Sequence, residues 1–293
     1  GFSIDMKNII KYPLILIMLC LVMACSGHKR QTSDKPIIAV TILPTAGIIK
    51  TLAGERVEVL TLLPDGATPE TYEPSMQDMS QLTRAQAWFY VGDLGFEQSW
   101  LSRIKELNPD LQLVRLDSGL MPLHNQEHMH NDGSVHASDP HYWMSIVGIE
   151  TMSRNIHRGL KALLPNEDFT AGSNEISQKI DSLRKIAKAR PFASKSFVIY
   201  HPSLASFAEE HQLKQLVIEQ NGKEPTINHL GNLVLQAQQD HASTMFFQKE
   251  FGANSKSTDY IRKEVNLHIM QINPFNPDWF TELSAIIQAL QQG

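Results

Sequence analysis

A chain of 293 residues is long enough for two compact domains, and with 42% hydrophobic and 19% charged residues it is neither disordered nor a coiled coil. The net charge of -5, without any basic run, argues against a nucleic-acid partner. Two cysteines exclude a disulfide scaffold and a cysteine-rich zinc module. Of the twelve histidines, five fall between His124 and His141, so a metal site is the first function to consider.

Residues 1–25 have the pattern of an export signal. A short basic region precedes an unbroken apolar run at 14–24, which is about half the length that a membrane-spanning helix needs. The run ends at Val22-Met23-Ala24-Cys25, which resembles the cleavage box of bacterial lipoproteins. We therefore expect lipidation at Cys25 and a polar leash at 26–35 that tethers the protein to a membrane outside the cytoplasm. An ordinary signal peptide with a chance cysteine is the alternative.

From residue 36 onward, short apolar segments alternate with helical ones. Strands are predicted at 36–42, 57–63, 87–91 and 112–116, and helices near 45–53, 75–85 and 96–107. Ser75 followed by Asp78 indicates a helix start with the serine as its cap. This alternation predicts βαβ units and a mostly parallel sheet.

A long helix is predicted at 166–190, where apolar residues repeat at helical spacing and Pro191 ends the pattern. A second alternating block follows. Its strands are predicted at 196–200, 213–219, 244–247 and 268–272, and its last helix at 277–291. The sequence therefore predicts an α/β protein with two lobes, 36–165 and 191–293, each with a mostly parallel four-stranded sheet. The helix at 166–190 joins the lobes; packing within one lobe is the alternative.

Candidate functional residues lie at the carboxyl ends of predicted strands, the edge where open α/β sheets bind ligands. The segments are 64–74, 139–143, 200–202 and 271–275. A single histidine beside a proline is more often a loop or capping residue than a ligand. Two histidines and a glutamate at strand ends in separate lobes are stronger evidence, since imidazole and carboxylate together suit a borderline cation such as zinc.

Four motifs occur in a characteristic order. They are Pro-x-Gly-Ala-x-Pro-x-x-Tyr-Glu-Pro from Pro64, Asp-Pro-His-x-Trp from Asp139, His-Pro at His201 and Gly-Lys-Glu-Pro from Gly222. This order resembles the TroA-like metal-binding proteins of zinc and manganese ABC importers, over about residues 36–292. The resemblance implies a monomeric, lipid-anchored receptor that captures Zn²⁺, with Mn²⁺ or Fe²⁺ as alternatives. Its partners would be an ABC permease and its ATPase, and it would have no enzymatic activity.

The resemblance places the metal ligands on Glu70, His141, His201 and Asn273. Two positions depart from the family, which usually has histidine where Glu70 stands and a carboxylate where Asn273 stands. This ligand set still contains one carboxylate, as the family's does, but an amide is a poor zinc ligand. We therefore expect zinc as the cargo, at a site that is somewhat more favourable to Mn²⁺ or Fe²⁺ than in the family. Water or a loop histidine can supply the fourth ligand.

A histidine-rich segment precedes the Asp-Pro-His motif, as in the zinc-binding branch of the family. Its histidines are His124, His128, His130 and His136. We expect an auxiliary loop that collects zinc at low affinity, and an ordinary surface loop is the alternative.

Two other function classes are compatible with these residues. Two histidines, one glutamate and an open position also describe a catalytic zinc site, although the chain has no His-Glu-x-x-His motif and no obvious general base. A surface adhesin with an incidental metal site is the other class.

Overall fold

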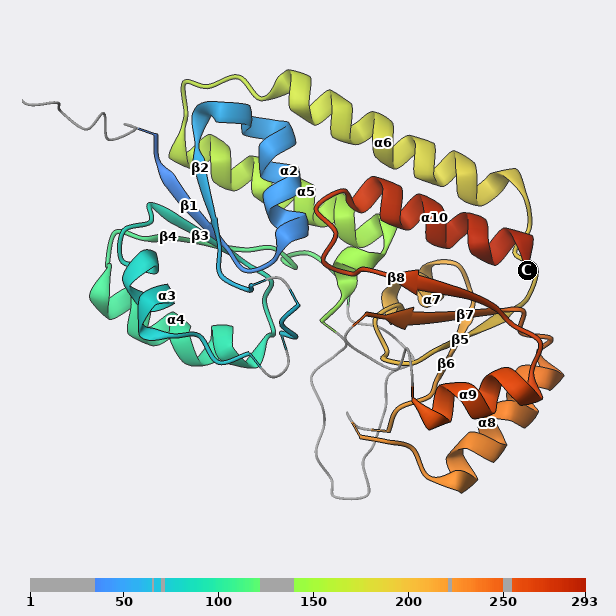
Figure 1. Cartoon of the computed structure of the whole chain (residues 1–293). Coiled ribbons are helices and arrows are strands. Elements are labelled where there is room, and N and C mark those ends of the chain that lie inside the picture. Colours follow the sequence, from blue (N-terminus) through green and yellow to red (C-terminus); the bar gives the residue numbers. More distant parts are fainter. Residues whose placement is uncertain (1–34, 65, 70–71, 122–139, 221–222, 250–254) are drawn as a thin grey trace, which may run out of the picture. The chain divides into compact units, whose positions relative to one another are not determined.

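Two four-stranded parallel sheets form the frame of the protein, as the alternating sequence pattern predicts (Figure 1). Their strand orders, β2-β1-β3-β4 and β6-β5-β7-β8, describe the same topology twice. The strands are β1 (Ile37–Val40), β2 (Glu58–Thr61), β3 (Ala87–Tyr90), β4 (Gln112–Arg115), β5 (Ser196–Ile199), β6 (Lys214–Val217), β7 (Thr244–Gln248) and β8 (His268–Ile272). Every strand lies within two residues of its predicted bounds.

The computed structural model describes residues 35–64, 66–69, 72–121, 140–220, 223–249 and 255–293. Within it, Pro36–Gly293 forms one unit that contains both sheets. The proposed signal and Cys25 lie outside the described residues, as do Glu70 and the histidine-rich segment from His124 to His136. None of the helices in the described ranges is both long and apolar enough to cross a membrane.

Helices cover both faces of each sheet. In the first lobe they are α2 (Leu43–Ala53), α3 (Met76–Leu82), α4 (Gly95–Leu107) and α5 (Ile146–Leu163), with the short 3₁₀ helices η1 (Gly54–Arg56) and η2 (Tyr142–Met144). In the second they are α7 (Ala205–Glu210), α8 (Ile227–Gln239), α9 (Lys256–Glu264) and α10 (Trp279–Gln292). The central strands are buried on both sides, which explains why β1 and β5 are almost continuously apolar in sequence.

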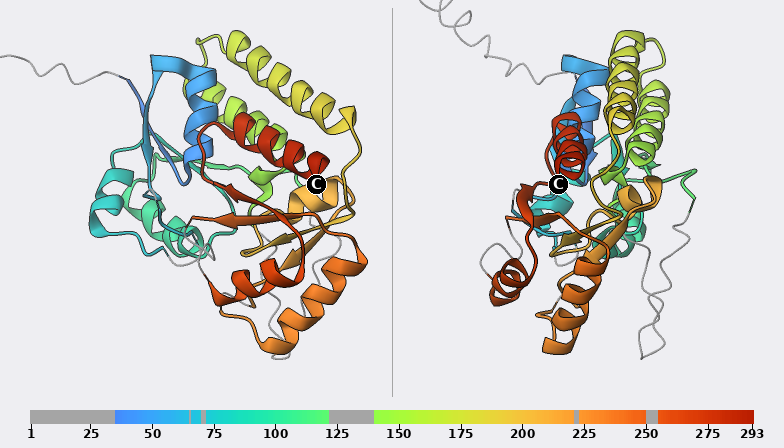
Figure 2. Two further views of the ribbon diagram at one scale, coloured as in Figure 1. Left: turned by 45° about the vertical axis from the view of Figure 1, so that its right-hand side comes forward. Right: turned by 90° about the vertical axis from the view of Figure 1, so that its right-hand side faces the viewer.

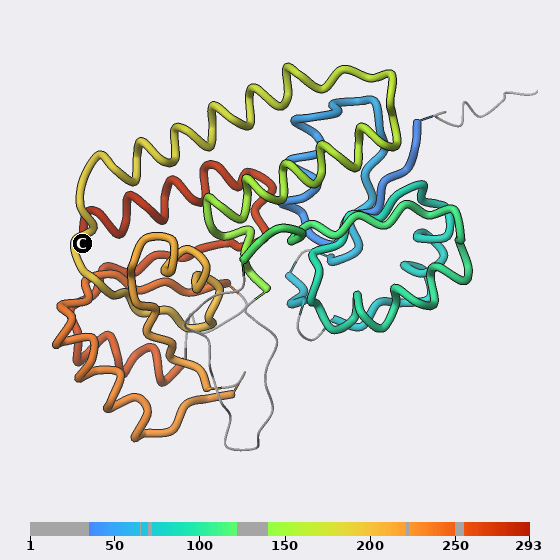
Figure 3. The backbone as a smooth tube through the Cα atoms, turned by 180° about the vertical axis from the view of Figure 1, so that it is seen from behind, coloured from blue at the N-terminus to red at the C-terminus, as the bar shows by residue number. Residues whose placement is uncertain are grey.

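One hydrophobic core runs through both lobes. Ile38 and Phe89 of the first sheet belong to the same buried cluster as Phe197 and Phe246 of the second. Helices α2, α5, α6 (Thr170–Ala189) and α10 contribute to this cluster, and α6 packs against the other three (Figures 1 and 3). The outer faces have smaller cores of their own, under α3 and α4 in one lobe and under α8 and α9 in the other. The lobes therefore share a helical layer, which the side view in Figure 2 shows above the sheets.

The long central helix is slightly shorter than the predicted segment 166–190. Helix α6 starts at Thr170, whose backbone N–H and hydroxyl both donate to the Asp168 carboxylate (2.9 and 2.6 Å). The 18-residue helix α5 was not among the predicted helices. In the described part of the chain, the helical layer that the lobes share therefore contains two long helices, α5 and α6.

Two glycines permit close approach within this layer. A Cβ atom on Gly172 of α6 would lie 2.4 Å from the carbonyl oxygen of Thr51 in α2. A Cβ atom on Gly47 of α2 would lie 2.1 Å from the carbonyl oxygen of Pro277, just before α10. Helix α2 therefore packs backbone to backbone against both α6 and the second lobe, and larger side chains at these positions would push the lobes apart.

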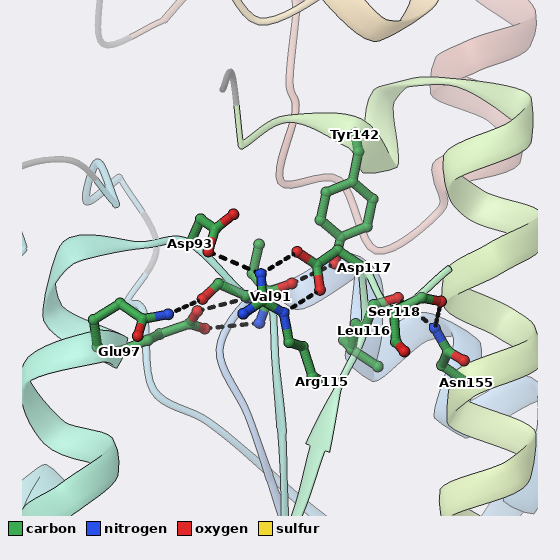
Figure 4. A network of polar contacts seen from close by, with 11 residues as sticks. Val91, Asp93, Glu97, Arg115, Leu116, Asp117, Ser118, Tyr142 and Asn155 are labelled. Atoms are coloured by element: carbon green, nitrogen blue, oxygen red, sulfur yellow. Dashed lines mark hydrogen bonds and ion pairs between the residues drawn. The ribbon is translucent and has the colours of Figure 1, made fainter. Parts of the chain in front are cut away.

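The carboxylate of Glu97 organises the carboxyl end of β3 (Figure 4). It is fully buried and accepts the backbone N–H groups of Val91 and Gly92, both at 2.8 Å, together with the hydroxyl of Thr41. Burial raises its pKa to about 6, although the hydrogen bonds act in the opposite direction. A buried carboxylate thus satisfies backbone donors that the strand end leaves without a partner in the sheet.

Glu97 predicts a specific dependence of stability on pH. Its pKa is higher in the folded protein than the ordinary value of 4.5, so its contribution is fully present below that value and is lost as the pH rises through about 6. The free energy of unfolding of the wild type, relative to that of Glu97→Gln, should fall by about 2 kcal/mol between pH 4 and 7. Urea titrations across this range measure it, with the partly exposed Glu150→Gln as control. Parallel pH profiles for the wild type and Glu97→Gln would contradict the assignment.

Candidate metal site

His141 lies at a sharp corner of the chain, immediately before η2 and α5. Ser145 caps α5, since its hydroxyl accepts the backbone N–H of Gly148 at 3.0 Å. Gly148 is required here because a Cβ atom would lie 1.7 Å from the carbonyl oxygen of Tyr142. The corner thus holds the His141 side chain in a fixed, almost fully buried place.

The two residues after His141 attach this corner to different lobes. The hydroxyl of Tyr142 donates to the carbonyl oxygen of Val91 at the end of β3, at 2.8 Å (Figure 4). The indole N–H of Trp143 donates to the carbonyl oxygen of Pro274 in the second lobe, also at 2.8 Å. Both donor side chains are buried, so the corner is fixed relative to both sheets.

His201 follows β5 in the second lobe and is also buried. Its ring lies against that of His141, with centroids 5.5 Å apart and the planes nearly perpendicular. Two imidazoles that share a tetrahedral zinc at about 2.0–2.1 Å per nitrogen have their ring centroids roughly 5 Å apart. The separation of the two rings therefore suits binding of one ion, with one ligand from each lobe.

Asn273 belongs to a neighbouring cavity of about 280 Å³. Asn273 lines it, together with Pro64 and Ala67 of the segment that carries Glu70. Phe275 also lines it, and its ring centroid lies 6.0 Å from that of Trp143, whose ring in turn lies beside His141. The three predicted ligands that the structure describes, His141, His201 and Asn273, therefore lie near the junction between the lobes.

Asn273 already has a structural role. Its side-chain oxygen accepts the backbone N–H of Phe275 at 3.0 Å, which forms a turn before α10. Its own backbone N–H donates to Glu282 at 2.7 Å. Asn273 is exposed, in contrast to the two histidines. A turn-forming amide with one lone pair still available is a weaker candidate ligand than either imidazole.

The residues that flank Glu70 are anchored, although Glu70 itself lies outside the described residues. The hydroxyl of Tyr72 lies 3.0 Å from the carbonyl oxygen of Leu62 and 3.0 Å from the carboxylate of Asp78. Ser75 and Asp78 form a reciprocal capping box at the start of α3, which confirms the predicted helix start. The carboxyl end of β2 and the start of α3 thus fix both sides of this segment.

Among the described residues, no group of three or more His, Cys, Asp or Glu side chains could hold a metal ion. A larger cavity of about 760 Å³ is lined by Tyr142 and Ser145, among other residues. Three of its charged groups pair with one another: Arg115 lies 2.8 Å from Asp93 and 2.6 Å from Asp117, as Figure 4 shows. Glu210 there accepts the N–H of Ile146 at the start of α5. The histidine pair is therefore the better candidate for metal binding.

The family model described as "Zinc-uptake complex component A periplasmic" (ZnuA) matches residues 38–293. The chain belongs to this family. Relatives include a putative metal-binding protein of Treponema pallidum, 25% identical over 88% of this chain and 85% of its own length. The high-affinity zinc uptake system protein ZnuA of Bacillus subtilis is 23% identical, over 88% of this chain and 84% of its own.

A zinc-binding lipoprotein, AdcA, of Streptococcus pneumoniae is 26% identical over 90% of this chain, which spans only 55% of that longer relative. A crystal structure of ZnuA has a TM-score of 0.77 and 29% identity, covering 89% of this chain and 99% of its own. A zinc-bound ZnuA with residues 138–173 deleted has a TM-score of 0.76 and 28% identity, covering 88% and 99%. The two-lobed fold is therefore that of a solute-binding protein of this family.

One residue of the site was missed by the sequence analysis. The carboxylate of Glu219, two residues beyond the end of β6, lies 3.0 Å from Nδ1 of His201. The sequence did place both residues at the ends of predicted strands, His201 after 196–200 and Glu219 at the end of 213–219. It did not show that these two strands are neighbours. Which strands pair, and in which register, is set by tertiary structure and could not be obtained from the sequence pattern.

The bond between Trp143 and Pro274 yields a prediction. Trp143→Phe keeps an aromatic ring but removes the donor to a buried carbonyl, so the free energy of unfolding should fall by about 1–3 kcal/mol. Because the corner then loses its hydrogen bond to the second lobe, zinc affinity should fall as well. Trp88→Phe is the matched control, since its indole N–H bonds to Thr41 within the first lobe. Equal zinc affinities for the two variants would contradict the role of this bond.

Proposed function

We propose that this protein captures Zn²⁺ outside the cytoplasmic membrane and delivers it to an ABC permease driven by its ATPase. The observation that carries the proposal is the pair of buried imidazoles, one from each lobe, with centroids 5.5 Å apart. Membership of the zinc-uptake family supports zinc as the cargo, as do relatives named for zinc binding. Zn²⁺ is the substrate, with Mn²⁺ or Fe²⁺ as the other candidates.

His141 and His201 are the proposed principal ligands, with Glu70 as the third and Asn273 or water as the fourth. Neutral nitrogen and amide ligands alone leave the charge of a buried divalent ion uncompensated, which is costly. Glu70 would supply the negative charge. The task of such a site is to bind and release an ion, so the proposal includes no catalytic step and no enzymatic activity.

Two further parts of the chain belong to this proposal. Cys25 would carry the lipid that anchors the protein to a bacterial membrane, with residues 26–35 as the leash. His124, His128, His130 and His136 would form an auxiliary, low-affinity zinc loop. The lipoprotein name of the pneumococcal relative supports the anchor, and the clustering of these four histidines directly before the Asp-Pro-His motif supports the loop.

Replacing either central histidine tests the proposal. Four-ligand zinc sites bind with about 10–16 kcal/mol, or roughly 3 kcal/mol per ligand, so His141→Ala and His201→Ala should each weaken tight zinc binding by about 100-fold. Competition with a chromophoric chelator measures the affinity. His268→Ala is the control, because His268 is exposed at the opposite, amino-terminal end of β8. Wild-type affinity in either test variant would remove that histidine from the site.

Glu70 is tested by removing its charge. Glu70→Gln is nearly isosteric and should weaken zinc binding at least tenfold, or about 1.4 kcal/mol, whereas Glu70→His should retain zinc and shift preference away from Mn²⁺. Glu73→Gln, an exposed carboxylate in the same segment, is the matched control. If Glu70→Gln binds zinc like the wild type, Glu70 is not a metal ligand.

A further inference from the structure

Parallel strand pairing places Glu219 beside His201. The register of β5 and β6 aligns Ile199 with Val217, and the pairing continues past the strand ends. The N–H of Ile218 donates to Ile199 at 2.9 Å, and the N–H of Glu219 donates to the carbonyl oxygen of Tyr200 at 3.1 Å. The two side chains are thus brought together by the backbone of the sheet and not by a chance contact of surface loops.

The two side chains form a buried pair. Nδ1 of His201 lies 3.0 Å from Oε1 of Glu219, and only 11% and 8% of the respective side chains are exposed. A carboxylate accepts hydrogen bonds, so this contact suits the tautomer of His201 that carries its proton on Nδ1. A neutral imidazole with its proton on Nδ1 has its lone pair on Nε2, which is the form that can bind a metal ion.

We propose that Glu219 is a positioning residue for zinc capture: it fixes the ring orientation and tautomer of His201 so that Nε2 binds the ion. This inference rests on the proposed function, in which His201 is a ligand. The negative charge of Glu219 also raises the basicity of the imidazole as a ligand and places a carboxylate behind an otherwise neutral donor. Glu219 contributes through His201 and does not itself bind the metal.

The contacts around His201 and Glu219 support a positioning role for Glu219. The turn after His201 is attached to β6, because Gln215 accepts the N–H of Leu204 at 2.8 Å. The nearby carboxylate of Glu224 has different partners: it accepts from the hydroxyls of Tyr200 at 3.1 Å and Ser257 at 2.9 Å. Glu224 therefore holds α9 against the end of β5, and Glu219 is the carboxylate of this region that acts on an imidazole.

A double-mutant cycle tests the proposal. Zinc affinity is measured by chelator competition for the wild type, Glu219→Gln, His201→Ala and the double variant. Glu219→Gln should weaken zinc binding 10- to 100-fold, and it should have no further effect once His201 is alanine. Glu150→Gln is the control, since it removes a carboxylate from an ion pair with Arg184 on α6. It should bind zinc like the wild type.

The outcomes separate this inference from the proposed function. If His201→Ala leaves affinity unchanged, the ligand assignment fails, and the inference fails with it. If His201→Ala weakens binding but Glu219→Gln does not, positioning by Glu219 is wrong while the proposed function stands. If Glu219→Gln weakens binding equally with and without His201, Glu219 acts independently of the imidazole, which also overturns the inference.

A spectroscopic measurement on the unaltered protein does not depend on any variant. Long-range ¹H–¹⁵N correlation spectra of the zinc-free protein report which ring nitrogen of each histidine carries the proton. His201 should carry its proton on Nδ1, and zinc should shift the Nε2 resonance. A proton on Nε2 in the zinc-free protein would overturn the proposal.

Discussion

The segment 141–143 is attached to both lobes, and this attachment determines where the candidate ligand His141 lies. Tyr142 binds the end of β3 through its hydroxyl, and Trp143 binds Pro274 in the second lobe through its indole N–H. His141 directly precedes both residues, so its position follows from two buried hydrogen bonds that extend in different directions. The contact between His141 and His201 therefore depends on the fixed relation between the lobes, because each ring comes from a different lobe.

The helical layer limits how the lobes can move. Helix α6 packs on α2, α5 and α10, and the two close approaches at Gly47 and Gly172 leave no room for side chains between these elements. A single core cluster runs beneath the layer from one sheet to the other. Wide opening of the lobes would break this core, so capture and release of an ion should involve small shifts or the loops around the site.

Much of the fold could be predicted because strand periodicity is local. All eight strands and the start of α3 at Ser75 follow from apolar runs and turn residues. Helix α5 was not predicted, although its buried residues Ile149, Met152, Ile156 and Leu160 repeat at helical spacing. For the site, His141 and His201 came from motifs, but Glu219 required the register of two strands. The turn formed by Asn273 depends on its bond to Phe275, which the sequence does not reveal.

Locating the ion directly tests the central claim that both lobes bind one zinc through His141 and His201. The measurement is anomalous diffraction at the zinc edge from crystals of the zinc-loaded protein. The account predicts a strong peak between the lobes, at about 2.0–2.1 Å from a ring nitrogen of each histidine. Zinc held only by other histidines, with both of these imidazoles free of metal, would contradict it.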